Sequence, residues 1–127
     1  MGELIARVSR MKPVAQILVG LVALIHVYIL VLEMVLWRTD RVRAVFGTTA
    51  EFAAESAPLA ANQGLYNGFL AAGLVYGLIA DDLAFIVFFL CCVIVAGIFG
   101  AVTANRRILF VQVLPGAVAL AAVLAAR

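Results

Sequence analysis

Two side chains that could exchange protons, Glu33 and His26, lie within one long apolar stretch of the sequence. An ionisable group costs roughly 2.5–3.5 kcal/mol to place in membrane hydrocarbon, so such groups usually face a bundle interior or a wet cavity and have a partner. On a helix, the spacing of seven residues puts His26 and Glu33 on one stripe, about 10 Å apart along the axis. Because burial disfavours the charged form of either group, the two could act as an acid–base pair, and we predict both as catalytic residues.

A second polar group lies at the start of the next apolar stretch and consists of Asn62, Gln63, Tyr66 and Asn67. Alternate members of this group form two adjacent columns on a helix, so a face of about 100° presents hydrogen-bond donors and acceptors. Trp37 lies one turn after Glu33, and Gln112 lies near the start of the last apolar stretch. We expect Glu33 to bond to at least one member of the group. We predict as ligand-binding residues Trp37, Asn62, Gln63, Tyr66, Asn67 and Gln112.

Each of these residues also has a purely structural interpretation. Asn and Gln side chains in membrane helices often only hold helices together, at less than about 2 kcal/mol each. Glu33 could be an interfacial acid paired with Arg38 or Arg41, and His26 could simply bond to a backbone carbonyl. The sequence does not choose between these interpretations and a functional site.

Composition favours lipid as the solvent. The chain has 127 residues, of which 67% are hydrophobic and 13% charged, whereas soluble domains have about 25% charged residues. The net charge of +2 is small and the basic residues form no stripe, so nucleic acid is not expected as a partner. We expect no metal or other cofactor, because His26 and Glu33 lie two turns apart and no second histidine exists.

The apolar stretches predict four membrane-spanning helices, at about residues 14–37, 59–80, 83–104 and 108–126. Asp81-Asp82 and Asn105-Arg106-Arg107 are short enough to be tight turns between neighbouring helices. Since every backbone group in lipid must bond within its own helix, we predict an all-α, four-helix transmembrane bundle with up-down-up-down topology. Residues 1–127 would then form a single membrane domain.

The segments outside the spans are less regular. Residues 1–13 suit either a short amphipathic helix on the membrane surface or a frayed terminus. In the connection 38–60, we predict a short helix capped by Thr48 or Thr49, with Pro58 standing before the second span. Four positive residues on one side and five on the other do not fix the orientation.

Small residues recur at a spacing of four in the second, third and fourth spans, as in Gly64 and Gly68 or Gly73 and Gly77. Such residues let helix backbones approach each other closely in a membrane. They could close the bundle of one chain or join two chains, so the pattern favours packing within the chain and leaves a homo-oligomer open.

The segments HVYILVLEMVLW, LAANQGLYNGFLAAGL and ILFVQVLPG resemble the family of domains of unknown function numbered 1304. That family consists of small bacterial and fungal integral membrane proteins with four predicted helices. The resemblance covers about residues 15–120 and implies a polytopic membrane protein, without implying an activity. The typical polar residues of the family correspond here to His26, Glu33, Trp37, Asn62, Gln63, Tyr66, Asn67 and Gln112.

Three functions fit these features. The first is a polar pocket within the membrane, formed by Glu33, His26, Asn62, Gln63 and Asn67, that binds or converts a small hydrophobic or amphipathic ligand. The second is a proton-coupled transporter, which the position of Glu33 near the end of its span disfavours. The third is an accessory subunit of a membrane complex. All three place the chain in a lipid bilayer, as a multi-pass protein of the bacterial inner membrane, and the sequence does not decide whether it is an enzyme.

Overall fold

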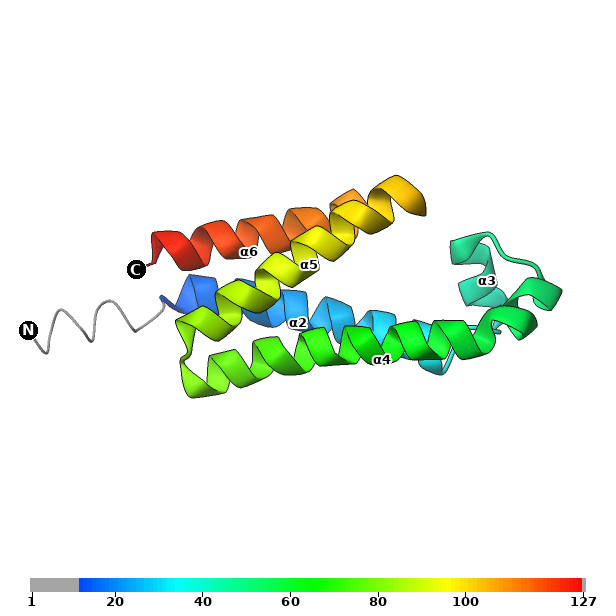
Figure 1. Ribbon diagram of the computed structural model, residues 1–127, viewed down its shortest axis with the longest axis horizontal. Helices are drawn as coiled ribbons and strands as arrows, with labels where there is room; N and C mark the ends of the chain where they lie inside the picture. Colours follow the sequence, from blue (N-terminus) through cyan, green and yellow to red (C-terminus); the bar gives the residue numbers. More distant parts are fainter. Residues whose placement is uncertain (1–11, 127) are drawn as a thin grey trace, which may run out of the picture. The chain divides into compact units, whose positions relative to one another are not determined.

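The computed structural model describes residues 12–126, and this part of the chain is all-α and contains no strand. The surface helix considered for residues 1–13 falls almost entirely outside the described residues. In chain order the helices are α2 (Pro13–Met34), α3 (Asp40–Phe46), α4 (Ala50–Ala80), α5 (Leu83–Thr103), the π-helical segment η1 (Leu109–Val113) and α6 (Leu114–Ala125) (Figure 1). The predicted fold class, all-α, is confirmed.

The chain divides into two compact units. The first unit comprises the chain up to Ile25 together with the chain from Leu70 onward, and the second comprises His26–Phe69. Helices α2 and α4 each pass from one unit into the other. We describe each unit by itself.

The core of the first unit is aliphatic. Its fully buried side chains come from α2, α4, α5 and α6, and include Val19, Leu74, Ile86, Leu90 and Val123. No charged residue among the described residues contributes to this core, so apolar packing is its main source of stability.

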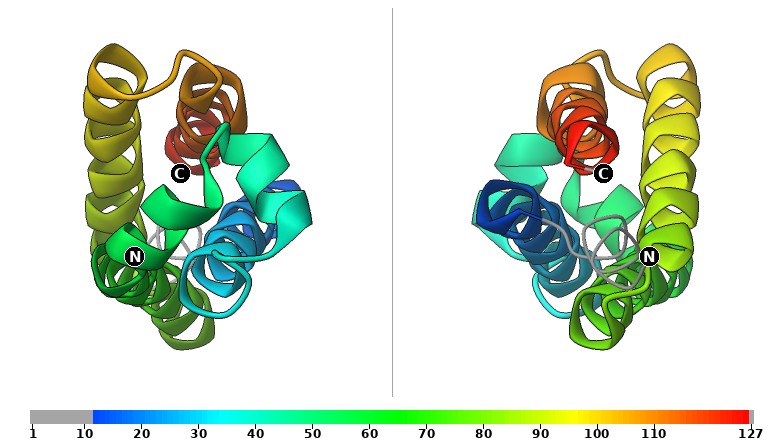
Figure 2. Two further views of the ribbon diagram at one scale, coloured as in Figure 1. Left: turned by 90° about the vertical axis from the view of Figure 1, so that its right-hand side faces the viewer. Right: turned by 90° about the vertical axis from the view of Figure 1, so that its left-hand side faces the viewer.

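Tight turns reverse the chain at both ends of α5, as predicted. Between α4 and α5, Asp81 adopts a left-handed conformation with φ 50°, and the Asp82 carboxylate accepts a hydrogen bond of 3.0 Å from the Phe85 amide. After α5, the side chain of Asn105 accepts a hydrogen bond of 2.8 Å from the Arg107 amide. Such Asx contacts stabilise turns and helix starts. The helices α5 and α6 consequently lie side by side (Figure 2).

A π-helical segment interrupts the last predicted span. Pro115 has no backbone N–H, so the usual helical bond to the carbonyl four residues earlier cannot form there. The amide of Leu114 instead bonds to the carbonyl of Leu109, five residues earlier. One wide turn therefore precedes α6, and Gln112 lies within it.

In the second unit α2 ends earlier than predicted, at Met34 rather than Trp37. The amides of Val35 and Leu36 both bond to the Val31 carbonyl, so the regular α-helical hydrogen-bond pattern ends there. The Leu36 carbonyl then accepts hydrogen bonds from the Thr39 amide at 3.0 Å and the Thr39 hydroxyl at 2.7 Å. Trp37 therefore lies in a turn after α2, and its predicted position one helical turn after Glu33 is wrong.

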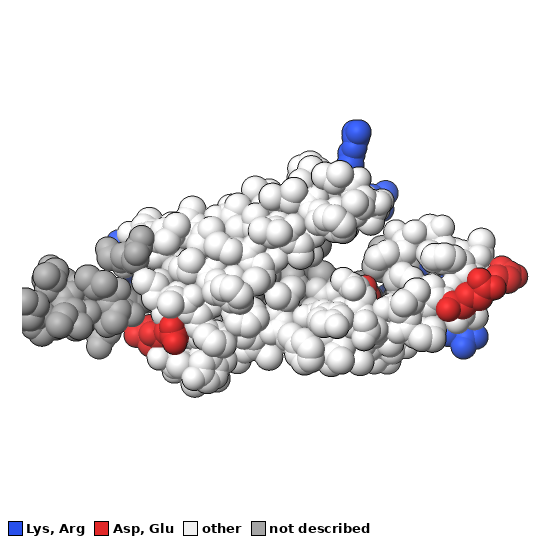
Figure 3. Space-filling view, viewed as in Figure 1, with Lys and Arg blue, Asp and Glu red and all other residues white. Residues whose placement is uncertain are grey.

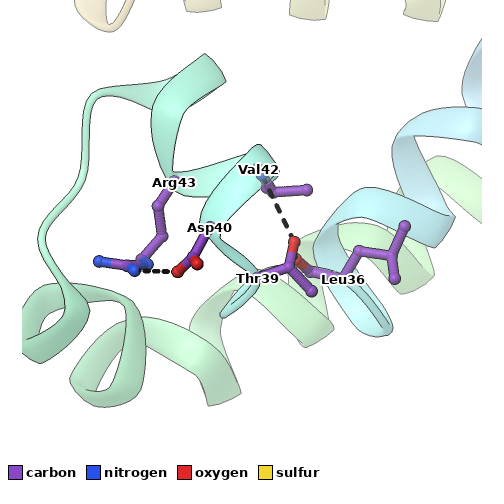
Figure 4. Close-up of polar contacts among 5 residues, drawn as sticks. All are labelled: Leu36, Thr39, Asp40, Val42 and Arg43. Carbon is purple, nitrogen blue, oxygen red and sulfur yellow. Dashed lines mark hydrogen bonds and ion pairs between the residues drawn. The ribbon is translucent and has the colours of Figure 1, made fainter.

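The short helix α3 is fixed at both ends by its own residues. Thr39 caps its first turn through the Val42 amide, and Arg43 forms an ion pair with Asp40 one turn earlier (Figure 4). At the other end, Gly47 adopts φ 69°, a left-handed conformation that glycine takes without strain.

Helix α4 differs from the predicted arrangement in one respect. Thr49 caps it, as predicted, by accepting a hydrogen bond of 3.1 Å from the Phe52 amide. The predicted short helix and second span are, however, one continuous helix of 31 residues, with Pro58 inside it. A proline removes one helical hydrogen bond, and the Ala-rich sequence on both sides favours helix strongly enough to continue past it.

Candidate functional site

Two glycines of α4 bring the end of α2 close to α4 within the second unit. A Cβ atom added at Gly64 would lie 2.6 Å from Met34 Cγ, 3.1 Å from Glu33 Cβ and 3.3 Å from the Leu30 carbonyl oxygen. A Cβ atom at Gly68 would lie 2.7 Å from Leu30 Cδ1. Glycine leaves room for this approach, and small residues are typical of positions where helix backbones come close.

The approach joins Glu33 to Asn67 by a hydrogen bond. The Asn67 side-chain amide donates to Glu33 Oε1 at 2.7 Å and to the backbone carbonyl of Gln63 at 3.2 Å. Asn67 is 9% exposed and Glu33 is half-buried. The prediction that Glu33 bonds to the polar group of the second span is confirmed, through Asn67.

The alternative in which Glu33 pairs with an arginine is wrong for the part of the chain described. Between residues 12 and 126 the one ion pair is that of Arg43 with Asp40 on α3. Arg38 and Arg41 are exposed. The hydrogen-bond partner of Glu33 Oε1 is thus a neutral amide, and no ion pair to Glu33 forms among the described residues.

His26 is fully buried, with 0% of its surface exposed, and begins the second unit. It lies about 10 Å from Glu33 along the helix axis, since seven residues separate them at about 1.5 Å each. Direct proton exchange between them is too long a step without an intervening group. Their joint action as an acid–base pair stays a prediction.

Trp37 lies apart from the Glu33–Asn67 contact. Its indole nitrogen donates a hydrogen bond of 3.0 Å to the Ser56 hydroxyl, and its ring lies 5.0 Å from that of Phe46. The Ser56 hydroxyl in turn donates to the Phe52 carbonyl at 2.6 Å. These contacts join α3 to the start of α4. The sequence pattern does not predict them, because it gives no sign that α2 ends before Trp37.

The other members of the polar group are exposed. Asn62 and Gln63 are exposed on α4, and Tyr66 is 54% exposed, with its ring 5.9 Å from that of Phe69. Gln112 belongs to the first unit, where its amide donates a hydrogen bond of 2.9 Å to the Val93 carbonyl. The structure therefore brings together Glu33 and Asn67, while the ligand-binding role of all six predicted residues stays a prediction.

A hollow of about 350 Å³ lies in the first unit and has a different character. Its lining is wholly apolar and comes from α2 between Leu18 and Ile25 and from α6 between Leu114 and Val118. No predicted site residue lines it. Among the described residues, no group of three or more His, Cys, Asp and Glu side chains is arranged to hold a metal ion.

The sequence profile of a family described as "Protein of unknown function (DUF1304)" matches residues 20–124. This range includes every predicted site residue. No curated protein and no solved structure matches the chain.

Proposed function

The chain belongs to the DUF1304 family of proteins of unknown function, and we propose that it is a multi-pass membrane protein whose Glu33–Asn67 site binds a small hydrophobic or amphipathic ligand. Binding is the function that the described geometry supports most directly, and conversion of the ligand would require a further group such as His26. The observation that carries the proposal is the hydrogen bond of 2.7 Å between Asn67 and a half-buried carboxylate.

The membrane location is supported by two helices and their surfaces. Helices α2 and α5 are long and apolar enough to cross a bilayer, and in each 28% of the most apolar window is buried. A helix at the core of a soluble protein would be mostly buried. Large apolar side chains of α5 such as Phe99 and Val102 are instead 69% and 81% exposed, and lipid is the solvent that suits such a surface.

The distribution of charge around α5 supports a membrane orientation for this helix. The Asp81-Asp82 turn precedes α5 and the Arg106-Arg107 turn follows it, while its 21 residues carry no charge. Figure 3 shows the surface between these ends as uncharged on the face in view. At 1.5 Å per residue the helix is about 32 Å long, close to the thickness of a bilayer core.

We extend the proposal to four spans in up-down-up-down order. The polar residues of α4 lower its hydropathy, and η1 with α6 forms the shorter apolar helix Leu109–Ala125. The reversals at Asp81-Asp82 and Asn105 support alternating directions for the last three spans. A bacterial inner membrane suits such a protein.

The cost of placing a carboxylate at this position argues for a functional role. An apolar pair of similar size would pack α2 against α4 at least as well as Glu33 and Asn67, because a buried charged group loses its hydration. Ionisable groups within membrane segments usually mark a site for ligands or ions. The glycine-lined contact holds this carboxylate in one place, which is what a binding site requires.

Glu33→Gln tests the proposal, with Glu55→Gln as the matched control. Glu55 is an exposed acid on α4 in the same unit. Each protein is purified in mild detergent, and native mass spectrometry measures the retained hydrophobic molecules. We expect Glu33→Gln to lose them and Glu55→Gln to keep them, with the melting temperature of Glu33→Gln equal to or above that of the wild type. Lower stability with unchanged retention would show a structural role for Glu33.

A further inference from the structure

The Glu33–Asn67 site presents acceptors to a ligand. The two hydrogens of the Asn67 side-chain amide are both engaged, one by Glu33 Oε1 at 2.7 Å and the other by the Gln63 carbonyl at 3.2 Å. A side-chain amide has two N–H donors and one oxygen. What Asn67 has left for a ligand is its oxygen, which can only accept.

Glu33 adds to this acceptor character. An ionised carboxylate has two oxygens and about four acceptor positions, and it has no donor. Asn67 occupies one of these positions through Oε1. The second oxygen, Oε2, is thus the acceptor that a ligand would contact, and the ligand would have to donate a hydrogen bond to it.

The charge at the site has the same consequence. In the described chain Arg43 is paired with Asp40, and Arg38 and Arg41 do not come within ion-pair distance of Glu33. When Glu33 is ionised, its carboxylate is therefore a formal charge at the site that has no ion-pair partner among the described residues. An anionic head group would be repelled, and the repulsion is strongest where water is scarce. An ammonium group would be attracted, and a hydroxyl group would be accepted.

We infer that the ligand of this site is an amphiphile whose head group donates hydrogen bonds, a hydroxyl or an ammonium on an apolar chain, and that carboxylate head groups are rejected. The inference rests on the proposed function, because it names the ligand class of the same site. It also specifies the chemistry of the head group, because the Glu33 carboxylate would select the head group as well as bind it.

A competition between three probes of equal chain length tests this inference. The protein is placed in nanodiscs of phosphatidylcholine with 1-dodecanol, dodecylamine and dodecanoate at equal mole fractions in the lipid. Native mass spectrometry counts each bound probe. We expect at least one donor probe to be bound about tenfold more than dodecanoate, which corresponds to about 1.4 kcal/mol. The amine and the alcohol distinguish a charge-based from a hydrogen-bond-based preference.

Variants assign the preference to Glu33. In Glu33→Gln the preference for donor probes should fall to less than about threefold, because glutamine has one acceptor oxygen and no charge. Glu55→Gln should keep it. Glu33→Asp retains the carboxylate and should keep the preference with weaker binding, so it serves as the test if Glu33→Gln fails to fold.

The possible failures are distinguishable. Binding that depends on Glu33 but favours dodecanoate, or treats all probes equally, would overturn the inference and leave the proposed function intact. Binding of every probe that is the same in the wild type, Glu33→Gln and Glu33→Asp would overturn both.

Discussion

The two units use the same packing device for different ends. In the first unit Gly73 and Gly77 of α4 admit α5, and a Cβ atom at either position would lie 2.5 Å from Phe89 or Ile86. In the second unit Gly64 and Gly68 of the same helix admit the end of α2. The first pair closes an aliphatic and aromatic core, while the second pair holds a carboxylate against an amide. What the glycines admit, rather than their spacing, distinguishes a packing contact from a candidate site.

The largest expected effect is that of Gly73→Val in the first unit. Its Cβ atom would lie 2.5 Å from Cε1 and Cζ of Phe89, a partly buried ring that packs against the core and would have to shift. Overpacking of this kind costs typically about 1–3 kcal/mol. We expect a clear fall in the melting temperature in detergent, with ligand retention per folded molecule unchanged. Loss of retention in the folded fraction would contradict the separation of packing from binding.

Gly64→Ala should have a smaller effect on stability and a larger one on binding. The added methyl group meets the flexible side chain of Met34 at 2.6 Å, which can move, and the Leu30 carbonyl at 3.3 Å, which is backbone. We expect a loss of about 1–2 kcal/mol and a loss of ligand retention, because a shift of α2 lengthens the bond between Glu33 and Asn67. Retention equal to that of the wild type would mean that the site does not depend on this contact.

Local signals in the sequence predicted much of this fold. Asp82 and Asn105 at the turns, Thr49 at the start of α4 and the cost of an unpartnered Glu33 each depend on chemistry within a few residues or on a general penalty. These features could be predicted because no distant contact competes with them. The bond from Glu33 to Asn67 was predicted from the cost of leaving a carboxylate without a partner in a predicted span.

Other features depend on contacts that the sequence pattern does not contain. At the end of α2, the Thr39 hydroxyl donates a hydrogen bond to the Leu36 carbonyl. In the turn between them, the Trp37 indole donates to the Ser56 hydroxyl. The apolar character of the sequence continues to Trp37, so it predicted a longer helix than α2. Pro58 likewise suggested the start of a helix. The helix instead runs through Pro58, because helical preference is summed over many neighbouring residues. The π-helical turn at Gln112 required knowing how Pro115 is accommodated.

Gln112→Leu tests whether a polar residue of the first unit is structural. The substitution removes the hydrogen bond of 2.9 Å to the Val93 carbonyl, and a typical hydrogen bond contributes about 1 kcal/mol. We expect a fall of that size in the free energy of unfolding, and unchanged ligand retention would favour this structural role over the predicted ligand-binding role. If retention falls while stability holds, Gln112 binds the ligand and the comparison between the two units fails.

The smallest expected effect is that of Gly20→Ala, which repeats the substitution made at Gly64 on a surface with no neighbour. A Cβ atom at Gly20 meets nothing within 4 Å in the structure. Alanine is the better helix former, and the gain at the centre of α2 should be about 0.5–1 kcal/mol. Thermal melting should therefore show an equal or slightly higher melting temperature, with ligand retention unchanged. A clear loss of stability would mean that another molecule covers α2 at this position. A second copy of the chain would be the first partner to test, by measuring the oligomeric state of the wild type and of Gly20→Ala in the same detergent.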